Sequence, residues 1–144
     1  MSDMIPNSAL KKFLNKEIDI DTDTIKVMLL TNSHANDADT QEFIDDVSAN
    51  QVSGTGYTAG GATLASKTLT QDNTNNKAVF DAGDITWSSA NGFTARYAVI
   101  YKDTGTAGTS PIIAIFDFGA DKTASGSDFI LTWNASGILS LAQA

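Results

Sequence analysis

Residues 95–119, ARYAVIYKDTGTAGTSPIIAIFDFG, decide the fold class of this chain, because they contain two apolar segments joined by a polar connector. In the first segment Tyr97 and Val99 alternate with Ala98 and Ile100, so both of its faces are apolar. Apolar residues on both faces are typical of a strand that is covered on both sides. The pattern therefore predicts a hairpin of two buried strands.

The second segment repeats this pattern after a connector of small polar residues. Alternation predicts one face with Ile112, Ala114, Phe116 and Phe118 and the other face with Ile113 and Ile115. The connector, KDTGTAGTSP at 102–111, contains only one acid and no apolar residue larger than alanine or proline. We interpret it as a loop for protein contacts, and the candidate contact residues in it are Asp103, Thr104, Thr106 and Thr109.

The composition fits one β-rich domain. The chain has 144 residues, of which 42% are hydrophobic and 18% charged. A chain of this size buries roughly 68–70% of its unfolded surface, which is enough for a core without disulfides. It has no cysteine, so disulfides and thiolate sites are excluded.

Short strand-like segments with turn signals between them extend the pattern along the chain. They lie at 25–30, 64–70, 77–81, 84–88, 129–133 and 138–141. Polar turns are predicted at DNTNN (72–76) and at 120–127. Together with the hairpin, this predicts an all-β fold: an antiparallel, jelly-roll-like β-sandwich of about eight short strands, in a single domain over residues 19–144.

The N-terminal residues 1–18 are predicted to be a loose arm (1–6) followed by a short helix. Asn7 or Ser8 is the expected cap, and Lys11, Lys12 and Lys16 are expected on the wet side. An apolar stripe at helical spacing consists of Leu10, Phe13, Leu14 and Ile18. A helix this short is marginal alone, so the stripe should bury against the body or against a neighbouring subunit. Leu10, Phe13 and Leu14 are therefore candidate protein-contact residues.

No catalytic, metal or cofactor site is expected. The motif D-x-D-x-D at 19–23 begins like a calcium loop, but Thr24 replaces the required glycine and Leu30 the bidentate glutamate, so we expect a solvated turn. The glycines at 54–61 lack the context of a phosphate loop and predict close backbone approach or mobility. The single histidine, His34, is expected in a surface loop. The acids at 37–46 are expected on a solvated face.

Charge restricts the partners. The formal net charge is −8, and an acidic chain repels phosphate, which argues against nucleic acid and anionic membrane as partners. We find no long apolar run and no signal-peptide order, so we expect synthesis in a cytoplasm.

Three further segments carry a family resemblance together with 95–119: KFLNKEIDIDTDTIKVMLLT (12–31), VSGTGYTAGGATLASKTLT (52–70) and ILTWNASGIL (130–139). Over residues 12–141 the chain resembles a family of small virion structural proteins of tailed bacteriophages, including cyanophages. The resemblance implies a capsid cement (decoration) protein on the outer surface of the shell. It further implies a homo-oligomer, with a trimer favoured, that contacts the major capsid protein. It implies no catalytic residues.

Two alternatives stay open at this point. The chain is equally compatible with a tail, neck or fibre component of the virion, because a β-sandwich suits each position. A module that binds host-surface glycans is the third hypothesis, with Tyr57 and Phe93 as its expected exposed aromatic residues.

Overall fold

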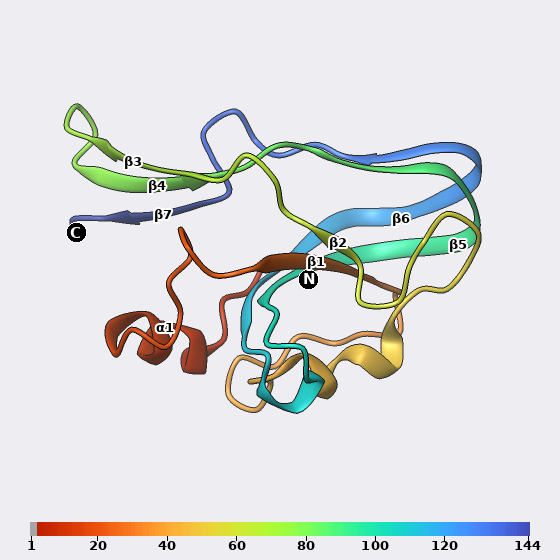
Figure 1. Cartoon of the computed structure of the whole chain (residues 1–144), viewed down its shortest axis with the longest axis horizontal. Helices are drawn as coiled ribbons and strands as arrows, with labels where there is room; N and C mark the ends of the chain where they lie inside the picture. Colours follow the sequence, from red (N-terminus) through yellow and green to blue (C-terminus); the bar gives the residue numbers. More distant parts are fainter. Residues whose placement is uncertain (1–2) are drawn as a thin grey trace.

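The computed structural model describes residues 3–144 as two antiparallel sheets with short helices at one side (Figure 1). One sheet has the order β2-β1-β5-β6 and the other the order β3-β4-β7. The elements are α1 (Asn7–Leu14), β1 (Ile25–Leu30), η1 (Ile44–Asp46), η2 (Ser48–Asn50), β2 (Ala62–Thr63), β3 (Thr68–Asp72), β4 (Lys77–Asp81), β5 (Ile85–Lys102), η3 (Ala107–Thr109), β6 (Ile112–Leu131) and β7 (Leu139–Ala142). The predicted all-β antiparallel sandwich with a short N-terminal helix is confirmed.

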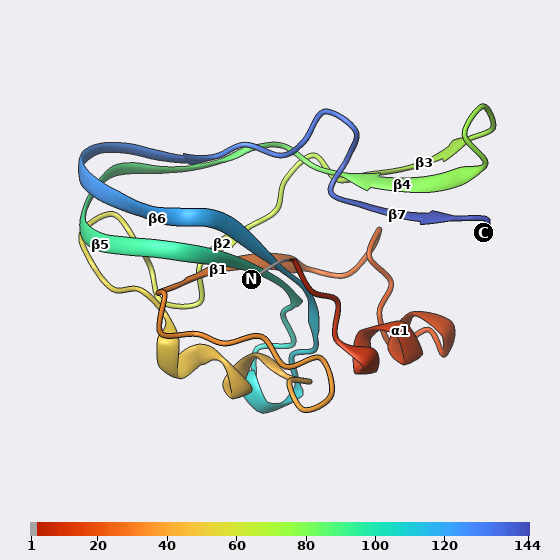
Figure 2. The same ribbon diagram turned by 180° about the vertical axis from the view of Figure 1, so that it is seen from behind.

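One long hairpin, β5–β6, supplies strands to both layers of the sandwich. Its strands have 18 and 20 residues and stay paired from Ile85 opposite Leu131 to Tyr101 opposite Ile112. Figures 1 and 2 show this hairpin bending back over itself. The outer part, which is the start of β5 and the end of β6, lies above the inner part, which is the end of β5 and the start of β6. The register shifts between Trp87 and Phe93, close to this bend, and bulges of this kind increase the local bending of strands.

The predicted division of this region into short strands was wrong. Residues 120–127 were expected to form a polar turn, but they belong to β6 and pair with β5. Most of their side chains are exposed, whereas Ala124 is buried, so one face of this strand meets water. Small polar residues with one face in water resemble a loop in sequence, and this is why the strand was missed. The described residues therefore contain seven named strands, two of them long, rather than about eight short ones.

The four-stranded sheet is covered on both sides, as the hairpin pattern predicted. Val27 of β1 and Ile100 of β5 lie in the core between the two layers, together with Trp87 from the upper part of β5. Leu30 and Val99 face the other way, into a second core that residues of the η1–η2 region cover. Strand β1 lies inside its sheet between β2 and β5, so the core strand predicted at 25–30 is confirmed.

A bulge changes the predicted faces at the start of β6. The register shifts opposite Ile100 and Tyr101, and Ile112 packs in the second core while Ile113 packs in the first. The predicted faces of these two isoleucines were therefore wrong, because a bulge interrupts strict alternation. Beyond it the alternation holds: Ala114 lies in the first core and Ile115 in the second.

The hairpin predicted around 72–76 is confirmed. Strands β3 and β4 pair from Thr68 opposite Asp81 to Asp72 opposite Lys77. The Asp72 carboxylate accepts hydrogen bonds from the backbone N–H groups of the turn, including that of Asn75 at 3.0 Å. These bonds replace backbone partners that the turn lacks. The hydrogen bond from the Asn75 side-chain amide, followed by the bond from its backbone N–H, holds the pKa of Asp72 below its ordinary value.

Candidate interaction surface

Helix α1 packs a mixed face of apolar and polar side chains against the body and leaves part of its apolar stripe in solvent. Ala9 and Lys12 are buried, whereas the side chains of Leu10 and Leu14 are 52% and 88% exposed. Phe13 is partly buried against the first core. Leu10 and Leu14, two of the three predicted contact residues of the helix, are therefore exposed to solvent in the structure of residues 3–144.

Lys12 holds the helix in this orientation. Its ammonium group forms an ion pair with the Glu42 carboxylate, lies 3.9 Å from the Glu17 carboxylate and 5.0 Å from the centre of the Phe43 ring. A buried ammonium is tolerated when it has such partners. The predicted exposure of Lys12 was wrong, because Glu42 lies 30 residues away in sequence and helical periodicity carries no information about it. Lys11 is exposed, as predicted.

The residues before the helix are held to the body. The backbone of Met4 exchanges two 2.8 Å hydrogen bonds with Ile115, and the Asp3 carboxylate accepts one from the Asp117 N–H at 2.9 Å. The N-cap is Pro6 rather than Asn7 or Ser8, and the Asn7 side-chain amide instead donates to Asp39 at 2.7 Å. The predicted loose arm was therefore wrong for residues 3–6, and its first two residues lie outside the described part of the chain.

The connector between β5 and β6 is an exposed loop with internal hydrogen bonds. The Asp103 carboxylate pairs with Lys26 at 3.1 Å and accepts the Gly105 N–H at 2.9 Å, and these contacts, the backbone bond first, lower its pKa. Thr104, Thr106 and Thr109 are exposed. Their side chains also bond within the loop, as in the 2.7 Å contact between the Thr104 and Thr109 hydroxyls. Hydrogen bonds within the loop thus fix its conformation, and the Asp103 carboxylate is held in an ion pair with Lys26.

Helix α1 and the connector lie on the same side of the four-stranded sheet (Figure 1). The segment 42–46 joins them, because Glu42 pairs with Lys12 and the Ile44 N–H donates to the Ser110 carbonyl at 2.9 Å. Both of the contact surfaces predicted from the sequence therefore occupy one side of the molecule.

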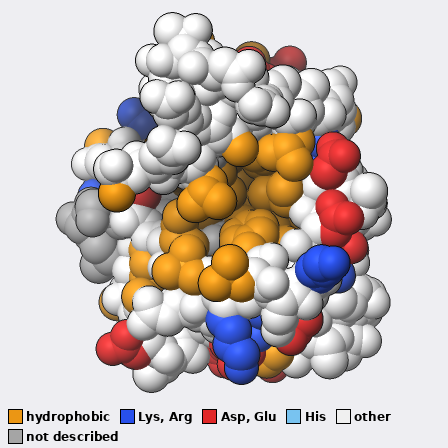
Figure 3. Space-filling model, turned by 90° about the vertical axis from the view of Figure 1, so that its left-hand side faces the viewer, with side chains coloured by type: hydrophobic (Ala, Val, Ile, Leu, Met, Phe, Trp, Pro, Cys, Tyr) orange, Lys and Arg blue, Asp and Glu red, His pale blue; other side chains and the backbone are white. Residues whose placement is uncertain are grey.

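The small sheet β3-β4-β7 adds an apolar surface that the sequence-based prediction did not include. The side chains of Leu69 and Leu141 are 51% and 81% exposed. Figure 3 looks onto the end of the molecule that carries α1 and this sheet, and shows hydrophobic side chains gathered in a hollow there. The alternation of Leu139 and Leu141 near the C-terminus is the signal in the sequence that indicates this face.

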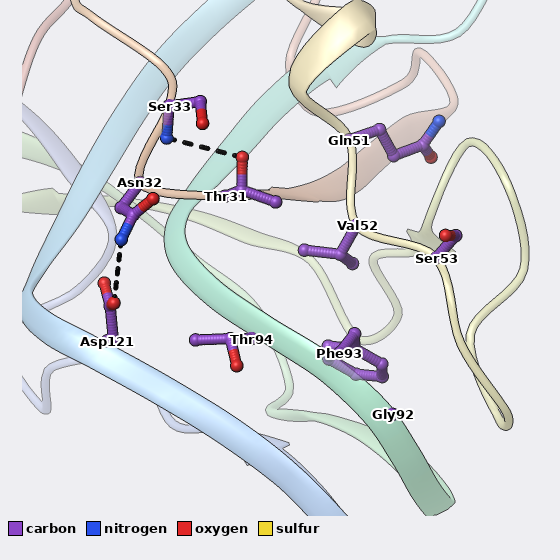
Figure 4. A pocket seen from close by; sticks show the side chains of 10 residues that line it. All are labelled: Thr31, Asn32, Ser33, Gln51, Val52, Ser53, Gly92, Phe93, Thr94 and Asp121. Carbon is purple, nitrogen blue, oxygen red and sulfur yellow. Dashed lines mark hydrogen bonds between the residues drawn. The ribbon is translucent and has the colours of Figure 1, made fainter.

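A polar pocket of about 510 Å³ lies on another part of the surface (Figure 4). Asn32 donates to the Asp121 carboxylate across it at 2.9 Å. The other lining residues are Thr31, Ser33, Gln51, Val52, Ser53, Gly92, Phe93 and Thr94. Asp121 is its one titratable residue, so the pocket offers hydrogen bonds but no pair of an acid and a base.

The aromatic residues proposed for glycan binding belong to the core. Phe93 is 5% exposed and its ring lies 5.6 Å from that of Tyr57. The Tyr57 hydroxyl donates to Gln51 at 3.1 Å and accepts the Leu29 N–H at 3.0 Å, and burial raises its pKa. The predicted exposure of these two rings was wrong, because their polar neighbours in sequence conceal their packing in space.

His34 is also buried, contrary to the predicted surface loop. It is 3% exposed, packs edge-on against the Tyr97 ring at 5.1 Å and contacts the Asn36 side chain at 2.8 Å. Burial lowers its pKa, since desolvation disfavours the imidazolium. Within residues 3–144 no group of three or more His, Cys, Asp or Glu side chains is placed to hold a metal ion.

The glycine-rich segment permits close backbone contact, one of the two predicted roles. A Cβ on Gly61 would lie 1.8 Å from the Val27 carbonyl oxygen, and its φ of +81° also favours glycine.

In the described part of the chain, no helix is both long and apolar enough to span a membrane.

Comparison with models of known protein families, with the curated proteins and with solved structures finds no match to this chain.

Proposed function

We propose that this chain is a non-enzymatic cement protein of a tailed-phage capsid, which attaches to the outer surface of the shell and bridges neighbouring capsomers. Its partner is the major capsid protein, and it acts as a homo-oligomer, with a trimer favoured. The family resemblance of residues 12–141 supplies the virion context, and the arrangement of α1 supplies the surface.

The observation that carries this proposal is the exposed part of the apolar stripe of α1. The helix buries Lys12 and leaves Leu14 88% exposed. An apolar side chain gains about 1.5–3 kcal/mol from full burial, so a helix free to rotate would turn its leucines inward. Because Lys12 has Glu42 and Phe43 as partners, the present orientation is specified. It places Leu10 and Leu14 side by side on the surface, where a protein partner can cover them.

The connector supplies the second contact surface. Its exposed threonines lie on the same side of the sheet as α1, so both surfaces can meet one flat partner. Hydroxyl groups on an ordered loop suit the polar rim of an interface around an apolar centre.

The net charge of −8 supports a position outside the shell. A protein displayed in many copies on a particle full of nucleic acid benefits from weak adhesion to phosphate, and acidic surfaces provide this.

A reconstruction of the intact particle at a resolution that shows strands tests the proposal. We expect density of this sandwich on the outer shell, with α1 and the connector toward the capsid surface. Density confined to the tail, neck or fibres would contradict the cement role and favour the alternative position on the virion.

A further inference from the structure

The small sheet β3-β4-β7 has one apolar face. Leu69 lies opposite Phe80, and Phe80 lies opposite Leu139, so these three side chains form one row. Ala78 lies opposite Leu141 in the next row of the same face. Every second residue of a strand shares a face, so Leu69, Phe80 and Leu139 point to the same side as Ala78 and Leu141.

The outer part of this face is uncovered. Phe80 is 3% exposed and packs in the core with the partly buried Leu139. Leu69 and Leu141 are 51% and 81% exposed, and Ala78 is exposed as well. Figures 1 and 2 show the reason, because the sheet projects beyond the body of the molecule. Within residues 3–144, no element covers this end.

The outer edge of β7 is also open. In the described chain β7 pairs with β4 alone. The Gln143 N–H donates to the Asn76 carbonyl, and alternation along an antiparallel strand then directs the backbone groups of Ser140 and Ala142 outward. Edge strands of soluble proteins usually carry a charge or a proline, and β7, with the sequence LSLA, has neither.

We propose that this surface docks a second copy of the same chain, whose β3 edge pairs with the β7 edge. Each copy offers one free β7 edge and one free β3 edge on the same sheet. Pairing like edges would leave both β3 edges open, whereas β7-to-β3 pairing is head-to-tail and leaves none open when the copies close into a ring. In such a ring the uncovered apolar faces of the copies turn toward the common axis and cover one another.

Charge at the two edges does not oppose this contact between copies. Two chains of net charge −8 repel, but β7 carries no charge. The one acid of β3, Asp72, lies opposite Lys77 of its own β4. The two edges can therefore approach without uncompensated carboxylates between them.

This inference rests on the homo-oligomer in the proposed function, and it is tested on the purified protein without capsids. Sedimentation equilibrium is measured for the wild type, Leu141→Asp, Ser140→Pro and the control Ile130→Asp. Ile130 is 58% exposed on β6, outside the small sheet, so it matches Leu141 in chemistry but not in place. Circular dichroism and thermal melting establish that each variant is folded.

We expect a wild-type ring larger than a dimer. Leu141→Asp should weaken self-association about tenfold or more, which corresponds to about 1.4 kcal/mol, and Ile130→Asp should leave it unchanged. Ser140→Pro blocks an outward backbone donor while leaving the apolar face, and decides the question if Leu141→Asp does not fold.

Three results would overturn the inference. An unchanged mass of both folded small-sheet variants would place the contact elsewhere. A wild-type dimer would contradict head-to-tail pairing, because only a two-fold contact stops at two copies. A wild-type monomer at every concentration would remove both this contact and the homo-oligomer. None of these results bears on attachment to the shell, which is measured separately with capsids.

Discussion

Helix α1 and the paired ends of β5 and β6 next to the connector both have apolar residues at regular spacing, but these residues pack differently in the two regions. In the hairpin, Val99 and Ile100 face opposite ways and both are fully buried. In α1 the stripe is equally clear, yet Leu14 is 88% exposed and Lys12 takes the buried place. Periodicity therefore identifies which residues share a face, but the partner of that face is decided by contacts remote in sequence.

The comparison predicts a large difference in stability between the two regions. Ile100→Ala should lower the free energy of unfolding by about 2–5 kcal/mol, because it leaves a cavity in the first core. Leu14→Ala should change it by no more than about 0.5 kcal/mol, since the side chain loses little contact. Urea denaturation of both variants checks this. A loss of several kcal/mol for Leu14→Ala would show that the helix buries its stripe in solution.

Substitution of Lys12 should cause the next largest loss of stability. Lys12→Ala should cost about 1–2 kcal/mol, because it removes a charged contact and leaves Glu42 without its cation. It should also speed amide hydrogen exchange in α1. Lys11→Ala is the matched control, because Lys11 is exposed on the same helix, and its effect should be negligible. Equal exchange rates in the two variants would contradict the specified orientation of the helix.

The buried side chain of His34 should make a smaller, pH-dependent contribution to stability. The pKa of His34 is lowered from its ordinary value of 6.5, so its neutral form is favoured in the folded state and the unfolded state binds the proton first. The folded protein should therefore be most stable above the pKa that His34 has in the unfolded chain, and it should lose stability as the pH falls below that value. Urea unfolding of the wild type and of His34→Gln at about pH 7.5 and about pH 5.5 checks this. The wild type should lose more stability than the variant on acidification, and parallel losses would argue against the burial of His34.

The fold could be predicted where alternation and burial agree. Residues 25–30 and 97–101 have apolar residues on both faces, and the structure places them inside the sandwich. The bend of β5–β6 could not be predicted, because residues 120–127 are small and polar and their strand pairing depends on β5, about thirty residues earlier at Thr94 opposite Thr123. The burial of Lys12 and of His34 could not be predicted for the same reason, because no local sequence pattern indicates the residues that pack against them.

The candidate surface was predictable in part. Leu10 and Leu14 were identified by helical spacing, and the structure leaves both exposed. Asp103 was identified as a contact residue on composition alone, and the structure pairs it with Lys26, a partner that only strand pairing brings near. The exposed face of β3-β4-β7 needed the sheet order, because Leu69 and Leu141 are 72 residues apart in sequence.

In the proposed function, the exposed leucines of α1 attach this protein to a capsid shell. Deletion of residues 1–18 is a poor test, because Met4 pairs with Ile115 and Ile18 lies in the core. The double variant Leu10→Ser/Leu14→Ser changes the stripe while sparing these contacts, and it should stay folded. Its binding to capsids that lack the protein, measured by co-sedimentation beside the wild type and Ile130→Ser, tests the claim most directly. We predict that the wild type and Ile130→Ser bind and the double variant does not; binding of the double variant equal to that of the wild type would contradict the account.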